Sequence, residues 1–181
     1  AIGRVAGEAK TEINAAGLIV APGFIDVHTH ADEVAEMPLA ENFVRMGVTT
    51  AIGGEGGTPV PAARVREYFT GLERTGISIN FGSYFSETQA RVAVLGRSAR
   101  APNAAELGRM RAIVDTAMLG GAMGMTTALI YPPSSYSTTE ELVEVARAAA
   151  RYGGTYASHI RDEGKGVVGA VRSVTLGGAV T

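Results

Sequence analysis

Strand-like and helix-like segments alternate along most of this chain, and that alternation constrains its fold more than any other feature. From Gly23 onward, short apolar segments that end in Gly, Thr or polar residues are followed by segments with helical spacing of apolar residues. Strands are predicted at 24–30, 49–53, 77–84, 124–131 and 154–159. Units of roughly 25 to 45 residues with this alternation indicate βαβ crossovers and a parallel sheet.

Two of the predicted helices begin at recognisable capping residues. Asn103 precedes Glu106 by three residues, the spacing of a capping box, and an apolar stripe then predicts a helix over 103–119. A later helix is expected to start at either Ser137 or Thr138. Further helical patterns lie at 61–75, 33–46 and 167–181, whereas 85–102 shows no clear period.

The strand count leaves two architectures open. Five predicted strands suit a complete open, doubly wound sheet, or a (β/α)8 TIM-type barrel that is truncated after about five βα units. The preceding residues, 1–20, read as short strands with turns and are expected to form the edge of a small β unit.

Composition and charge argue against several classes of partner. The net charge is −2 and the 16 basic residues are scattered, so no nucleic-acid partner is expected. No apolar run approaches the roughly 20 residues of a membrane span, so we expect a soluble, cytoplasmic protein without membrane contact. The chain starts without Met or a signal-peptide pattern, and we expect its true start to be missing.

All three histidines lie at the carboxyl ends of predicted strands, where parallel α/β proteins place their active sites. The two-residue period of a strand puts His28 and His30 on one face, with Asp26 below them. His159 ends the last predicted strand. Because the chain has no cysteine, a metal at this edge must be held by imidazoles and carboxylates.

Glu55 is the only residue with a side chain in a glycine-rich segment, 53–57, directly after the second predicted strand. The flanking glycines allow unusual backbone angles and close approach, so Glu55 is a candidate metal ligand that can bridge two cations. A phosphate-binding turn and an ordinary turn with an exposed acid are the alternatives.

Tyr131 ends the fourth predicted strand, before two prolines, and its hydroxyl is expected to reach the mouth of the site. The same strand contains no lysine, because the only lysines of the chain are Lys10 and Lys165. A carboxylated lysine that bridges two metals at this strand is therefore excluded. Arg161, Asp162 and Glu163, which follow the last strand, are either a functional shell or charges that open the next helix.

These motifs together resemble the amidohydrolase superfamily, and most closely its N-acyl-D-amino-acid deacylase (D-aminoacylase) family. The superfamily marker is the segment 17–30, which reads GLIVAPGFIDVHTH. The markers of the deacylase family are GVTT at 47–50, YPP at 131–133 followed by TTEE at 138–141, and YASHIRDEG at 156–164.

The resemblance implies a barrel with metal at its carboxyl rim. Residues 1–20 would be the end of a small β-sandwich domain and 21–181 the first part of the barrel. By this resemblance His28, His30 and His159 are metal ligands, and Tyr131 helps to hold the scissile carbonyl. The family's metal-binding Cys would fall on Gly56, so we expect neighbouring Glu55 to take that role.

The implied activity is zinc-dependent hydrolysis of the amide bond of N-acyl-D-amino acids, with one or two zinc ions. The general acid/base Asp of the family is expected beyond Thr181, so no catalytic residue is assigned within this chain, and the 181-residue piece alone is expected to be inactive. The alternatives are another amidohydrolase, such as a dihydroorotase-like cyclic amidase or a dipeptidase, and a non-catalytic α/β ligand-binding domain.

Overall fold

The computed structural model describes residues 3, 7 and 9–171 of the chain, and in this part all paired strands are parallel. The strands form two three-stranded sheets, with orders β1-β2-β3 and β4-β5-β6. Their bounds are β1 (Phe24–Asp26), β2 (Val48–Gly53), β3 (Asn80–Ser83), β4 (Phe85–Ser86), β5 (Gly124–Ala128) and β6 (Thr155–His159). The prediction of an α/β fold with parallel strands is confirmed.

The two sheets join near the end of the strand predicted over 77–84, where β3 lies within the predicted range and β4 follows directly after it. Tyr84 lies between them, and its backbone N–H donates to Gly53 O at 3.1 Å, while Met123 N–H donates to Ser83 O at 3.0 Å. These bonds connect β2 with the junction and the junction with the entrance to β5. The strands of the described chain therefore follow one another in space in chain order, without the reversal of a doubly wound sheet.

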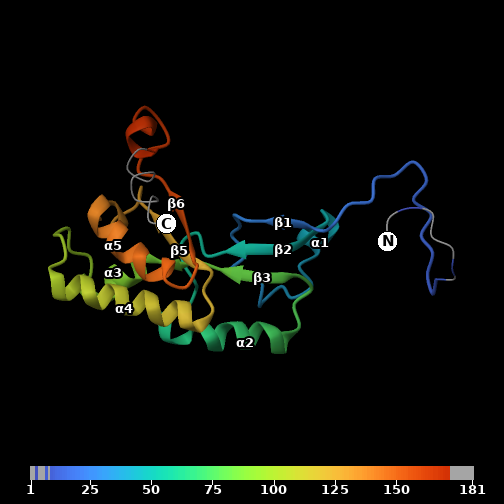
Figure 1. Ribbon diagram of the computed structural model, residues 1–181, viewed down its shortest axis with the longest axis horizontal. Helices are drawn as coiled ribbons and strands as arrows, with labels where there is room; N and C mark the ends of the chain where they lie inside the picture. Colours follow the sequence, from blue (N-terminus) through green and yellow to red (C-terminus); the bar gives the residue numbers. More distant parts are fainter. Residues whose placement is uncertain (1–2, 4–6, 8, 172–181) are drawn as a thin grey trace.

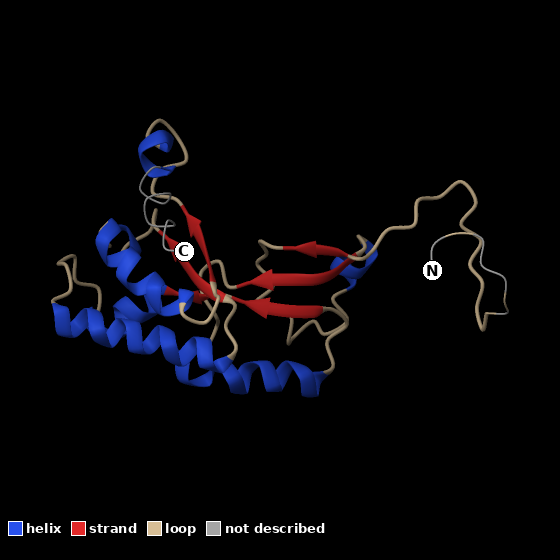
Figure 2. Cartoon of the chain, in the orientation of Figure 1, coloured by secondary structure: helices blue, strands red, loops and turns tan. Residues whose placement is uncertain are grey.

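The helices α2 and α4 lie along one side of the strands (Figures 1 and 2). The helical elements are α1 (Glu41–Arg45), η1 (Ala62–Arg64), α2 (Val65–Thr75), α3 (Glu87–Leu95), α4 (Ala104–Gly120), η2 (Ser134–Tyr136) and α5 (Thr139–Ala150). None of the helices in the described part of the chain is long and apolar enough to cross a membrane.

Capping residues act where the sequence predicts them. Asn103 Oδ1 accepts the backbone N–H of Glu106, and Glu106 Oε2 accepts the N–H of Asn103, both at 2.9 Å, which completes the capping box of α4. Of the two alternatives for α5, Thr138 is the cap, because its hydroxyl accepts the N–H of Glu141 at 3.2 Å. Helix α2 ends at Gly76 in the left-handed conformation, as expected.

Several predicted boundaries are wrong. The segment 85–102 contains β4 and α3 instead of an aperiodic insertion, and the helix predicted over 33–46 is reduced to α1. Pro38 disfavours helical geometry in the residue before it and interrupts the pattern. The described residues between 3 and 20 form turns and extended chain rather than short strands, and this segment leads away from the sheets (Figure 1). Its apolar Ile19 is 96% exposed, so the described chain leaves this side chain almost entirely uncovered.

Strands β1 and β5 end earlier than predicted, for local reasons, whereas β2 and β6 end at the predicted residues. Strand β1 stops at Asp26, whose Oδ1 accepts the backbone N–H of His28 at 3.2 Å and so competes with the sheet. Strand β5 stops at Ala128, where Tyr131 N–H turns back to the carbonyl of that residue at 3.1 Å. The helical pattern at 167–181 is present over 167–171, and its remainder lies outside the described residues.

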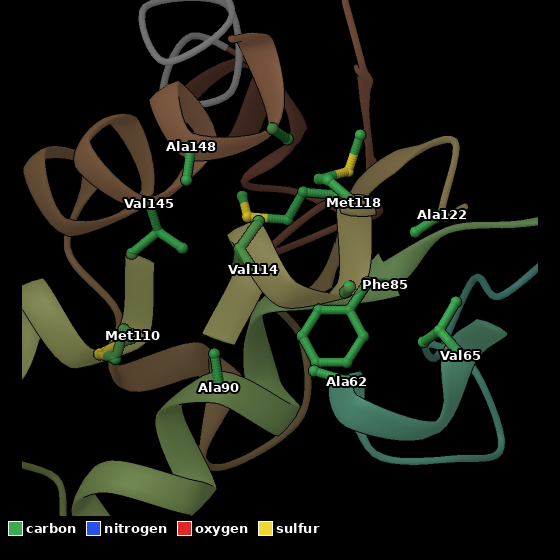
Figure 3. Packing of buried hydrophobic residues seen from close by; sticks show 13 residues of the cluster. Ala62, Val65, Phe85, Ala90, Met110, Val114, Met118, Ala122, Val145 and Ala148 are labelled. Atoms are coloured by element: carbon green, nitrogen blue, oxygen red, sulfur yellow. The ribbon is translucent and has the colours of Figure 1, made fainter. Parts of the chain in front are cut away.

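The main hydrophobic core surrounds α4 (Figure 3). Met110 and Val114 of α4 are fully buried, together with Phe85 of β4, Met125 of β5 and Val145 of α5. A second cluster packs β2 and α2 against the segment that follows β1, through Ala31, Val34, Ala40, Ala51, Leu72 and Ile79. These two clusters hold the strand ends at fixed positions relative to one another.

Candidate metal centre

Three strand ends bring the predicted site residues together. His28 and His30 follow the end of β1, Glu55 follows the end of β2, and His159 is the last residue of β6. Thr29, between the first two histidines, holds its segment against β2, since its N–H and its hydroxyl both donate to Ile52 O, at 3.1 and 3.2 Å.

The glycine-rich turn after β2 presents Glu55 through backbone geometry that a larger residue would not adopt. Gly54 has φ of 81°, and a Cβ there would lie 2.4 Å from the carbonyl oxygen of Tyr84. Gly57 has φ of 100°, and its N–H donates to Gly54 O at 2.8 Å to close the turn. The sequence rationale for these glycines, close approach and left-handed backbone, therefore holds at both positions.

A residue of β5 fixes this turn from the opposite side. The hydroxyl of Thr126 donates to the backbone carbonyl of Glu55 at 3.0 Å, and Thr126 itself is fully buried. The main chain of Glu55 is thus held between β2 and β5. Its side chain is left to project toward the histidines.

The Glu55 carboxylate lies among the imidazoles. His28 Nε2 is 3.0 Å from Glu55 Oε1, His30 Nε2 is 2.8 Å from Oε2, and His159 Nδ1 is 3.9 Å from Oε1. The Glu55 side chain is only 13% exposed, whereas those of His28 and His30 are 62% and 80% exposed. The carboxylate is therefore buried at the base of the site, with the two strand-one histidines above it.

The side chains gathered here are of the types that bind a divalent cation. Glu55 Oε2 is buried and has no hydrogen-bond partner within the described residues, although His30 Nε2 is close to it. Three imidazole nitrogens and one carboxylate, without a thiolate, form a ligand set typical of zinc and of neighbouring transition metals. Within the described residues, no group of three or more His, Cys, Asp or Glu side chains is spaced to hold a metal ion, and the Nε2 atoms of His28 and His30 lie 3.0 and 2.8 Å from the Glu55 carboxylate oxygens.

Two further side chains contact His159. Glu163 Oε1 lies 2.9 Å from His159 Nδ1, the same nitrogen that faces Glu55. The ring of Tyr131 stacks on the imidazole, with ring centroids 5.8 Å apart and an interplanar angle of 29°. The structure therefore places Tyr131 beside the site, in the turn after β5 rather than within the strand.

The charged residues that follow His159 have separate roles. Asp162 accepts the backbone N–H groups of Gly164 and Gly166, at 2.7 and 3.0 Å, and so caps the chain that enters the next helical residues. Arg161 donates to backbone carbonyls of the segment that follows β5. Only Glu163 of the three contacts a candidate ligand.

Asp32 is a neighbour of the site that the sequence interpretation missed. Its Oδ1 is buried without a hydrogen-bond partner among the described residues. Burial raises the pKa of Asp32 above its ordinary value, although the backbone N–H of Gly54 and the imidazole of His30 act in the opposite direction. The sequence offered one clue to Asp32. His28, His30 and Asp32 are each two residues apart, so Asp32 continues the spacing of the two histidines.

Comparison with known proteins identifies the family. A model of the amidohydrolase family matches residues 11–174. The chain belongs to the amidohydrolase family.

Within this family the chain is similar to deacylases of D-amino-acid derivatives. It is 34% identical to D-aminoacylase of Alcaligenes xylosoxydans xylosoxydans, over 90% of this chain and 38% of the relative. It is also 34% identical to the N-acyl-D-glutamate deacylase of the same organism, over 97% of this chain and 40% of the relative. The chain thus spans about two fifths of the length of these relatives.

Solved amidohydrolase structures show the same fold. The crystal structure of D-aminoacylase matches with a TM-score of 0.80 and 31% identity, over 87% of this chain and 38% of that chain. The N-acyl-D-glutamate deacylase of Bordetella bronchiseptica, solved with zinc and a phosphonate mimic of the tetrahedral intermediate, matches with a TM-score of 0.77 and 33% identity, over the same shares. D-aminoacylase is described with a binuclear metal centre.

Proposed function

We propose that this amidohydrolase is part of a zinc-dependent deacylase that hydrolyses the amide bond of N-acyl-D-amino acids. The observation that carries the proposal is the convergence of His28, His30 and His159 on the buried Glu55 carboxylate, at the carboxyl ends of parallel strands. The similarity to D-aminoacylase over 90% of the chain supports the same reaction.

We further propose that the described strands are the first part of a (β/α)8 barrel. Their chain-order arrangement supports this, since neighbours in a barrel follow the chain. Strand β1 also exposes large apolar side chains, with Phe24 59% and Ile25 64% exposed. Further elements of a barrel would cover such apolar side chains on a strand at the edge of the sheet.

The metal would be held by His28 and His30 through Nε2, by His159 through Nδ1, and by the carboxylate of Glu55. A zinc ion held there would supply an acidified water and would polarise the substrate carbonyl. The carboxylate is suited to a bridging role because its two oxygens face different histidines, Oε1 facing His28 and Oε2 facing His30. One or two zinc ions are compatible with this donor set.

The chain's own contribution to the reaction centres on Tyr131. Hydrolysis adds water across the amide C–N bond, so the acyl carbon leaves as a carboxylate and the nitrogen as the free amine of a D-amino acid. The phenol O–H of Tyr131 is assigned to donate to the oxyanion that develops on the acyl oxygen. Its ring is oriented by stacking on His159. The proton transfer from water to the leaving amine is not assigned to any residue of the described chain.

Two alternatives are less well supported. Amidohydrolases that bridge two metals with a lysine on the fourth strand require that residue, and β5, which corresponds to it, contains none. A non-catalytic binding domain would not need a largely buried carboxylate that faces three imidazoles.

The test is an assay of the protein at its full length with matched pairs of N-acetyl-D- and N-acetyl-L-amino acids. We expect hydrolysis of the D series, lost after chelation and restored by zinc. His28→Ala and His159→Ala should each reduce both bound zinc and turnover. A preference for the L series would refute the D-deacylase assignment, and turnover that is independent of metal would refute the metal site.

A further inference from the structure

The segment between β5 and α5 carries Tyr131 and is tied to the end of β6 by one arginine. Arg161 Nη1 donates to Ser135 O at 2.9 Å, and its Nη2 donates to Ser137 O. No carboxylate of the described chain forms an ion pair with Arg161. Its guanidinium donates from two nitrogens to two carbonyls of the same short segment, an arrangement that the single ammonium group of lysine does not reproduce.

The same segment is held at its other end by the ring contact between Tyr131 and His159. His159 and Arg161 are only two residues apart, so the end of β6 contacts the segment 131–137 at two places. The first contact sets the ring of Tyr131 against a candidate ligand. The second fixes the backbone that follows it.

A buried polar cluster holds the segment from below. Ser137 Oγ lies 3.1 Å from Glu87 Oε1 and 3.4 Å from Glu141 Oε1, and Arg91 donates to Glu141. Glu87 and Arg91 are fully buried, and Glu141 is 4% exposed. Ser137 is thereby attached to the interior, so Arg161 clamps the segment against a rigid base.

We infer that Arg161 is a positioning residue, which holds the segment 131–137 so that the Tyr131 hydroxyl stays directed at the substrate carbonyl. The inference rests on the proposed function, since it deepens the role given there to Tyr131. Arg161 acts through Tyr131 and does not itself touch the reacting atoms. Loss of the clamp lets the phenol move, and a displacement of about 1 Å at a catalytic group costs up to about 100-fold in rate.

A double-mutant cycle separates this role from substrate binding. In the full-length protein with an N-acetyl-D-amino acid, Arg161→Ala should lower kcat by about 10- to 100-fold with little change in KM. Added to Tyr131→Phe, it should cost little more than Tyr131→Phe alone. Arg161→Lys, which keeps the charge but loses the fork, should give an intermediate kcat. Additive effects would overturn the inference, because they would mean that Arg161 acts independently of Tyr131. A loss confined to KM would also overturn it, because it would indicate a role in substrate binding.

Hydrogen exchange provides a readout that does not depend on turnover. The amides of Ser135, Tyr136 and Ser137 close the turns of this segment, and Arg161→Ala should speed their exchange while α4 stays protected. Arg64→Ala is the matched control, because Arg64 pairs only with exposed Glu67 in the described structure. Unchanged exchange in Arg161→Ala would overturn the clamp even in an active enzyme. Faster exchange in a protein without D-deacylase activity would instead refute only the proposed function.

Discussion

Replacing Gly54 with alanine should displace Glu55 and weaken metal binding. Gly54 has φ of 81°, and its Cβ would lie 2.3 Å from Ser83 Oγ and 2.4 Å from the carbonyl oxygen of Tyr84. The left-handed conformation costs a residue with a Cβ about 1–2 kcal/mol, and the overlap with backbone forces the turn to move as well. We expect the free energy of unfolding to fall by about 2–3 kcal/mol in total.

The same turn contains its own control. A Cβ at Gly56 would meet no atom within 4 Å, and its backbone is outside the left-handed region. Gly56→Ala should therefore change stability by less than about 0.5 kcal/mol. The assay is urea unfolding of both variants beside the wild type, followed by calorimetric zinc titration. Equal effects of the two substitutions, or full zinc affinity in Gly54→Ala, would refute the reasoning about how the turn presents Glu55.

Three substitutions of carboxylates test charge and pH dependence. Glu55→Gln keeps the side-chain shape without the charge, and calorimetry should show zinc affinity reduced at least about 100-fold, since even indirect metal partners contribute 10- to 100-fold. Arg100 and the N–H of Asn103 lower the pKa of Glu106 from 4.5 to about 2, so its stabilisation is complete above about pH 4.5 and is lost toward pH 2. Urea unfolding of Glu106→Gln should show a stability deficit that shrinks over that range. Burial and nearby Glu141 raise the pKa of Glu87, so the wild type should lose stability as pH rises above about 4.5, and Glu87→Gln should not.

Each of these expectations has a contrary result. Glu36→Gln, which changes an exposed carboxylate, is the control for zinc affinity, and an equal loss in both variants would contradict the role of Glu55. A pH-independent deficit in Glu106→Gln would mean that the pair with Arg100 does not set its titration. If the stability of Glu87→Gln declined with rising pH as the wild type does, a group other than Glu87 would cause the decline.

Features that depend on neighbouring residues could be predicted from the sequence. The start of α4 follows from Asn103 and Glu106, because their reciprocal bonds join residues three apart. The position of the histidines at strand ends was predictable for a similar reason, since apolar strand patterns stop just before them. Their common approach to Glu55 follows once parallel strands are inferred, because parallel strands end at the same edge.

Features that depend on distant partners could not be predicted. Helix α3 has no clear apolar period because its buried face carries Glu87 and Arg91, whose partners Ser137 and Glu141 lie about 50 residues away. The contacts of Arg161 could not be predicted either, because its acceptors are backbone carbonyls, which every residue type has. The early end of β1 was also not predicted, because it depends on a hydrogen bond in which the side chain of Asp26 accepts the backbone N–H of His28.

The most direct test of the metal centre is an anomalous difference map, recorded at the zinc absorption edge from crystals of the full-length, zinc-loaded protein. The account predicts a peak bounded by His28 Nε2, His30 Nε2, His159 Nδ1 and the carboxylate of Glu55, at roughly 2.0–2.2 Å from the coordinating atoms. A zinc peak elsewhere, or no peak among these four side chains in an active enzyme, would contradict it.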